Sequence, residues 1–146
     1  MRKLIAAASL AAVGLALLAI PASASFDHHF TVLEKASFKP FSNETAFRFR
    51  GKLFDPRNRD DRVGRDRGVC KVRPSGTLRC RGTYHLNGEI GGFGDIKVRG
   101  NLQSGKPQRL NVIGGSGDFN GAAGKLLFED LNRRATKSLD HFALVR

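Results

Sequence analysis

Residues 110–128 read LNVIGGSGDFNGAAGKLLF, and this stretch decides the fold. Two apolar runs, Leu110–Ile113 and Leu126–Phe128, flank a segment rich in glycine. Such runs are typical of buried strands, and clustered glycines between them indicate positive φ or the close approach of another segment. The stretch therefore predicts two strands joined by a tight turn, with turn residues Gly114, Gly115, Gly117, Gly121 and Gly124.

The chain from residue 25 onward repeats this pattern of short, alternating segments, and none shows the period of a helix of normal length. We predict eight strands: His29–Lys35, Ala46–Phe54, Gly68–Arg73, Gly76–Leu86, Glu89–Leu102, Gln108–Ile113, Gly124–Asp130 and Ser138–Val145. The period alone fits a sandwich or a barrel. Glycines inside strands favour closure, because they relieve strong bending. The expected fold is an eight-stranded antiparallel up-and-down β-barrel, one domain over residues 25–146.

The first 24 residues have the composition of a cleaved signal peptide. Arg2 and Lys3 precede the apolar stretch Leu4–Ile20, and Ala22-Ser23-Ala24 forms a small-residue cleavage site after Pro21. The alternative is an uncleaved membrane anchor. No later apolar stretch is long enough to span a bilayer as a helix. The sequence thus predicts a protein that is secreted or held in the cell envelope, with no transmembrane anchor after cleavage.

The charge balance is strongly basic. Loss of Arg2 and Lys3 with the leader leaves 23 basic and 13 acidic residues, a net charge of about +10. Such a surface favours an anionic cell-surface polymer as partner, although high charge also serves solubility alone. Nucleic acid is not expected as a partner, because export separates the protein from it. The sequence also has no tryptophan and a single tyrosine, Tyr84, whereas a single-strand binder needs exposed aromatic side chains among its basic residues.

Cys70 and Cys80 are the two cysteines, within GVCKVRPSGTLRCRG. They lie equidistant from Ser75 in the turn Pro74-Ser75-Gly76, so they would face each other across a hairpin. An oxidising compartment favours a disulfide there. No third ligand is spaced near them, so no metal site is predicted.

Strong catalytic and cofactor-binding motifs are absent from the sequence. It has neither a G-x-S-x-G elbow nor an H-E-x-x-H pair, and Lys125 is followed by Leu126 where a P-loop needs Ser or Thr. We therefore expect no cofactor. The polar segment Asp55–Arg67 is interpreted as a solvated loop, or alternatively as a flap over the barrel mouth or an inhibitory loop that contacts a partner.

Glu34 is the carboxylate with the strongest case for a role in the site. It shares strand parity with Phe30 and Val32, so it points into the barrel if that parity does. Inside, its pKa would be raised and it could act as an acid or stabilise a cation. Outside, it would pair with a lysine or arginine. The aromatic candidates for lining the pocket are Phe47, Phe49, Tyr84, Phe93 and Phe142.

The order GGSG-x-F-x-GA-x-G resembles the strand-turn-strand signature of allene oxide cyclases and the related GGTG signature of dirigent proteins. Further similarities are Val32-Leu33-Glu34, the segment Phe49–Phe54, which resembles PFSNKLY, and Gly68-Val69-Cys70. Two asparagine positions of the cyclase pocket are Ala36 and Gly51 here. The chain looks like a secreted bacterial member of this barrel superfamily.

The resemblance implies a barrel that binds one small hydrophobic ligand in its lumen, with Glu34 at the acidic position of the pocket floor. It would act as a cyclase or isomerase, or direct the stereochemistry of a reaction without proton chemistry. The rival hypothesis is a basic secreted or cell-envelope binding protein without enzymatic activity. Related barrels are often dimers or trimers, so the resemblance also allows a homo-oligomer.

Overall fold

Eight antiparallel strands close into a barrel in chain order, and β8 pairs with β1. The computed structural model describes residues 27–41, 45–103 and 106–145. The predicted signal peptide lies outside the described residues. The predicted fold class is confirmed. The strands are β1 (His28–Pro40), β2 (Ala46–Phe54), β3 (Arg62–Val72), β4 (Leu78–Asn87), β5 (Phe93–Leu102), β6 (Gln108–Gly115), β7 (Ala123–Asp130) and β8 (Lys137–Val145).

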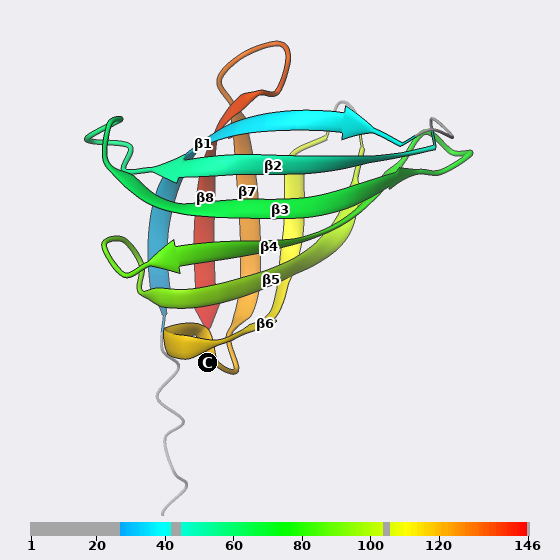
Figure 1. Cartoon of the computed structure of the whole chain (residues 1–146). Coiled ribbons are helices and arrows are strands. Elements are labelled where there is room, and N and C mark those ends of the chain that lie inside the picture. Colours follow the sequence, from blue (N-terminus) through cyan, green and yellow to red (C-terminus); the bar gives the residue numbers. More distant parts are fainter. Residues whose placement is uncertain (1–26, 42–44, 104–105, 146) are drawn as a thin grey trace, which may run out of the picture.

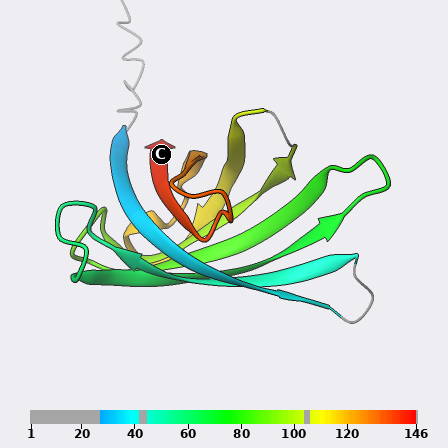
Figure 2. The same ribbon diagram turned by 90° about the horizontal axis from the view of Figure 1, so that it is seen from above.

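The barrel has two walls that cross each other. Figure 1 shows β2, β3, β4 and β5 running across the front, with β6, β7 and β8 running steeply behind them. The long, curved β1 joins the two walls, and Figure 2 shows this bend from above. Side chains alternate between lumen and solvent along each strand. The alternation that the sequence predicted therefore decides which residues enter the site.

Three strand boundaries differ from the sequence prediction by four or more residues. β3 begins at Arg62, so the segment predicted to be a polar loop is a loop only before that residue. Cross-strand pairing with β2 and β4 keeps this charged segment extended. β5 begins at Phe93 rather than Glu89, because Gly88, Gly91 and Gly92 take positive φ in the turn before it. β1 continues past Lys35 to Pro40, paired with β2 throughout.

A disulfide joins β3 to β4, as predicted. Cys70 and Cys80 lie directly opposite in the register of the two strands, and their sulfur atoms are bonded. Both side chains are buried and face the lumen. The bond therefore fixes the register of the hairpin and forms part of the interior wall.

The glycine-rich stretch forms the turn between β6 and β7 and contains a single 3-10 turn, η1 (Gly117–Phe119). Gly124 has φ of 139°, and a Cβ there would collide with the carbonyl oxygen of Ala143. A Cβ on Gly115 would likewise collide with the carbonyl oxygen of Asp95. These close backbone approaches explain why the stretch requires glycine.

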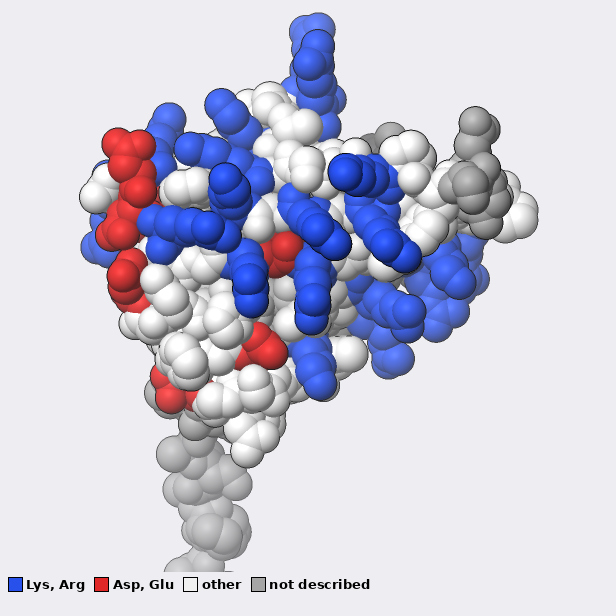
Figure 3. Space-filling view, viewed as in Figure 1, with Lys and Arg blue, Asp and Glu red and all other residues white. Residues whose placement is uncertain are grey.

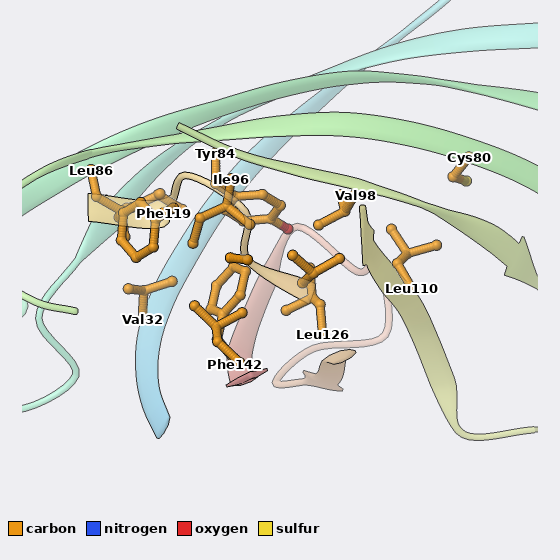
Figure 4. Packing of buried hydrophobic residues seen from close by; sticks show 14 of the residues in the cluster. Val32, Cys80, Tyr84, Leu86, Ile96, Val98, Leu110, Phe119, Leu126 and Phe142 are labelled. Atoms are coloured by element: carbon orange, nitrogen blue, oxygen red, sulfur yellow. The ribbon is translucent and has the colours of Figure 1, made fainter. Parts of the chain in front are cut away.

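The turn also carries Phe119 into the barrel, where it closes one end of the lumen. Phe119 is 2% exposed and packs in a cluster with Val32, Leu86 and Ile96. Figure 4 shows this cluster around Phe142, with Cys80 standing apart toward the other end. The core thus fills one end of the barrel and leaves the other end for a pocket. Among the described residues no helix is long and apolar enough to cross a membrane.

Candidate functional site

The other end of the lumen is an open pocket of about 630 Å³. This volume lies within the range of roughly 300–1,000 Å³ that is usual for small-molecule sites. Its wall is mostly apolar, and polar side chains lie at its floor and mouth. The apolar part of the wall is formed by Phe38, Phe47, Phe49, Leu78, Leu102, Leu110, Phe128 and the Cys70–Cys80 disulfide. The pocket therefore suits a small organic molecule with a large apolar surface.

Three carboxyl groups are buried where the pocket meets the core. Glu34 on β1 is 6% exposed, Asp66 on β3 is 3% exposed and Asp140 on β8 is fully buried. Glu34 lines the pocket itself, together with Ser138 and Tyr84. No lysine or arginine among the described residues forms an ion pair with this carboxyl cluster, which we define as Glu34, Asp66 and Asp140. The cluster thus presents acid groups without a compensating charge.

Gly51 makes room for the carboxyl cluster. It lies on β2, between the strands that carry Glu34 and Asp66, and faces Asp66 directly in the register. A Cβ on Gly51 would collide with Oδ1 of Asp66 and would come within 2.7 Å of Oε1 of Glu34. Any side chain here would force the carboxyl groups apart. Gly51 therefore shapes the floor of the pocket.

Two hydroxyl groups hold Asp140 in place. Tyr84 donates from Oη to Oδ2 of Asp140 over 2.9 Å, and Ser138 donates from Oγ to Oδ1 over 2.6 Å. Ser138 Oγ also lies 3.3 Å from Oε2 of Glu34. A serine hydroxyl has one proton and the shorter contact uses it. The longer contact is therefore satisfied when a protonated Glu34 donates to Ser138.

The pKa values of the cluster agree with a protonated Glu34. Burial, followed by the nearby charges of Asp140 and Asp66, raises the pKa of Glu34 to about 11. Burial and Asp140 raise the pKa of Asp66 to about 7. Burial also raises the pKa of Asp140, against the hydrogen bonds from Ser138 and Tyr84. At neutral pH Glu34 is therefore a neutral acid beside groups that share the negative charge.

Both carboxyl oxygens of Asp66 are buried without a hydrogen-bond partner among the described residues. A buried oxygen in this state costs free energy that a packed apolar side chain would not. A protonated Glu34 has one O–H group, which it can donate either to Ser138 or to Asp66, and donation to Asp66 is consistent with proton-sharing in the cluster. Asp66 is thus placed to exchange a proton with Glu34.

The structure separates the predicted aromatic residues into three groups. Phe47, Phe49 and Tyr84 line the pocket. Phe142 lies in the core behind it, stacked on Phe30 at 4.8 Å between ring centroids. Phe93 is 56% exposed at the start of β5, outside the lumen, because it alternates in step with the outward Asp95 and Lys97.

Sequence reasoning singled out Glu34 but left open whether it faces the lumen or the outside, and it missed Asp66, Asp140 and Ser138. A signal existed for two of them, because Ser138 and Asp140 alternate in step with Phe142 and Leu144 and so share the inward face. Asp66 had no such signal, since its segment was interpreted as a loop. The described residues include no group of His, Cys, Asp and Glu placed to hold a metal ion.

The fold and the site together define a class of protein: a small antiparallel barrel with a luminal pocket and buried acid groups at its floor. A scan against protein-family models matches none of them, and a search of curated proteins finds no relative. Solved structures of the same fold do exist. The resemblance to dirigent-like and cyclase-like barrels is confirmed at the level of the fold.

Three of these structures illustrate the range of activities that their names describe. A pyocyanin demethylase has a TM-score of 0.60 and 20% identity, over 80% of this chain and 98% of its own. A pterocarpan synthase dirigent protein has a TM-score of 0.63 and 12% identity, over 83% and 84% of the two chains. The Diels–Alderase AbmU from Streptomyces koyangensis has a TM-score of 0.61 and 16% identity, over 86% and 70%.

Proposed function

We propose that this protein binds a small, largely apolar organic molecule in its lumen and catalyses a cyclisation or isomerisation there. The observation that carries the proposal is Glu34, a neutral carboxylic acid on the floor of an apolar pocket. An acid kept neutral at pH 7 can donate a hydrogen bond or a proton to a ligand oxygen. Barrels of the same fold are described as a demethylase, a pterocarpan synthase and a Diels–Alderase, which supports chemistry on small organic molecules.

The carboxyl cluster suggests how the reaction would be assisted. Glu34 would donate its proton to an oxygen of the ligand, such as an epoxide oxygen, while the carbon–oxygen bond breaks and positive charge develops on carbon. The negative charge shared by Asp66 and Asp140 would stabilise that cation in a site shielded from water. The Glu34 carboxylate left by this transfer would then accept a proton from the carbon beside the cation, which completes the isomerisation and restores the neutral acid. The aromatic wall from Phe47 and Phe49 would fix the orientation of the ligand.

Ligand binding is tested with the neutral fluorescent dye Nile red, whose emission rises in an apolar pocket. Leu102→Trp fills part of the pocket with an indole ring and should weaken dye binding by about tenfold, since the dye can then bury less of its own apolar surface. Ile113→Trp is the matched control, because Ile113 lies on the adjacent β6 but is half exposed on the outside. Equal dye binding by the two variants would remove the lumen as the ligand site.

The chemistry is tested by comparing the wild type with Glu34→Gln. The substrates are aryl epoxides, whose opening needs a proton on oxygen. We expect Glu34→Gln to bind Nile red normally but to lose about 100-fold in turnover, the usual contribution of a general acid. Gly51→Ala should lose turnover too, because its Cβ displaces both carboxyl groups. Equal turnover by wild type and Glu34→Gln would contradict the acid role.

A further inference from the structure

The outer surface of β2, β3, β4 and β5 carries a dense array of positive charge. We call this the basic face; its ten members are all exposed and point away from the lumen: Arg48, Arg50, Lys52, Arg65, Arg67, Lys71, Arg79, Arg81, Lys97 and Arg99. Figure 3 shows their side chains crowded over this wall. Asp95 is the one acidic residue with the same outward direction on these four described strands, and it pairs with His85.

The arrangement is unfavourable for the folded barrel by itself. Arg50 lies directly opposite Arg67, and Lys52 lies directly opposite Arg65. The same holds for Lys71 with Arg79 and for Arg81 with Arg99. Like charges directly opposite each other in a sheet are destabilising. Solubility would be served equally well by charges that are dispersed, so their concentration on one wall indicates a ligand of opposite charge.

The spacing of the cations identifies the repeat of that ligand. Outward side chains recur every second residue, about 6.6–6.8 Å along a strand, as for Arg48, Arg50 and Lys52. A phosphodiester unit on a three-carbon polyol has six backbone bonds, as a dipeptide has. Its extended repeat is therefore also about 7 Å. Such a chain lying along a strand would place one phosphate at each cation, and the arginine forks suit phosphate oxygens.

The other large polyanions fit the basic face less well. Single-stranded nucleic acid has a similar backbone repeat but needs aromatic platforms for its bases. Two outward aromatic side chains lie on the four described strands, and both are at strand ends. The ammonium of Lys35 covers the ring of Phe54 at 4.2 Å, and Phe93 packs edge-on with His85, so neither stands among the cations as a platform. A flat membrane would contact only a narrow part of this convex wall, and few outward apolar side chains are available there to insert into the bilayer. Inorganic polyphosphate carries its charges much closer together than the cations of one strand.

From these observations we propose that the basic face binds a linear polyol-phosphate polymer, a phosphodiester chain without bases, along strands β2–β5. The groove between Arg48, Arg67 and Arg81 on this wall, with Lys97 at its edge, is where such a chain would lie deepest. This binding does not depend on the chemistry proposed for the lumen. It assigns a second, external site to the barrel.

The test measures binding of fluorescently labelled poly(glycerol phosphate) by anisotropy at several salt concentrations. We expect tight binding at low salt and a steep loss as salt rises, because each neutralised phosphate releases counterions. The variant Arg67→Glu/Arg81→Glu should weaken binding by about tenfold or more and reduce the slope of log affinity against log salt by about two.

Arg59→Glu/Arg133→Glu is the matched control. It changes the net charge by the same amount at exposed loop positions that are not members of the basic face. It should retain affinity within about twofold, since its charges make no direct phosphate contact. An equal loss in both variants would show a response to net charge alone and would overturn the proposal.

Competition separates the alternative ligands. Unlabelled poly(glycerol phosphate) should displace the labelled polymer from the protein at a lower phosphate concentration than the other competitors do. These competitors are single-stranded DNA, inorganic polyphosphate and vesicles of phosphatidylglycerol and phosphatidylcholine. Stronger competition by DNA would assign the face to nucleic acid, and stronger competition by polyphosphate would refute the spacing argument. Preferential binding to the vesicles would assign it to a membrane. Each of these three results overturns the proposal.

Discussion

Glu34, Asp66 and Asp140 occupy lumen positions where apolar side chains would pack at lower cost. The burial of three carboxyl groups without a cation opposes folding, because each must remain protonated or carry an unfavourable charge. The hydroxyl groups of Ser138 and Tyr84 offset part of this cost for Asp140 alone. Asp66 receives no such help, so it is the residue whose replacement should reveal the cost.

Asp66→Asn should therefore stabilise the protein in a pH-dependent way. The folded-state pKa of Asp66 is about 7, against an ordinary value of 3.8, so the folded state binds more protons than the unfolded state between these values. Stability of the wild type then falls as pH rises through this window. The variant should match the wild type near pH 3.5 and exceed it by about 2–4 kcal/mol above pH 7.5.

Urea denaturation of both proteins at pH 3.5, 5.5 and 8 would measure this difference. Asp55→Asn is the control, because Asp55 is at a loop position, its pKa is lowered by hydrogen bonds from Arg57, and it does not contact the cluster. The stability of Asp55→Asn relative to the wild type should not increase as the pH rises. A difference between Asp66→Asn and wild type that stays constant with pH would contradict a raised pKa at Asp66.

At the scale of the strands, one face of β2–β5 lines the lumen and the other face is exposed to solvent. Each presents pocket or core residues inward and cations outward, as Phe49 and Arg50 do on β2. The strict alternation made β2 predictable to the residue. β3 was predicted too short, because Arg62–Arg67 contains charged residues that alternation alone did not separate from the preceding loop. The pairing of that segment with β2 and β4 decided its conformation.

Arg67→Glu should make the barrel more stable. The new carboxylate would lie opposite Arg50, replacing a repulsive cross-strand pair by an attractive one, with a gain of about 0.2–1 kcal/mol. Thermal denaturation at low salt would show a higher midpoint, and added salt should reduce the gain because the pair is exposed. Arg59→Glu, in the loop before β3, should show no comparable gain. Destabilisation by Arg67→Glu would refute the repulsion inferred for the basic face.

At the scale of the whole molecule, the barrel wall separates the two proposed sites. The pocket is lined by the inward residues of the same strands whose outward residues form the basic face. The wall is held in register by cross-strand pairing and by the Cys70–Cys80 bond. We therefore expect that the two sites are filled independently.

Nile red titrations with and without saturating poly(glycerol phosphate) would measure this independence. The dissociation constant for the dye should change by less than about twofold, which corresponds to a coupling free energy near zero. Leu102→Trp should weaken dye binding while leaving polymer binding intact, and Arg67→Glu/Arg81→Glu should do the reverse. Mutual exclusion of dye and polymer would place them in one site and contradict the two-site description.

The sequence by itself determined the eight-strand pattern, the facing cysteines and the need for glycine between β6 and β7, because period, turn chemistry and spacing are local properties. It also singled out Glu34 by parity; the signal peptide stays a prediction. The carboxyl cluster was decided by tertiary structure alone. Glu34 and Asp66 come together at Gly51 when β1 and β3 pair with β2, and Asp140 joins them only when β8 closes the barrel onto β1. The pKa of a carboxyl group depends on burial and neighbouring charge that no single segment contains.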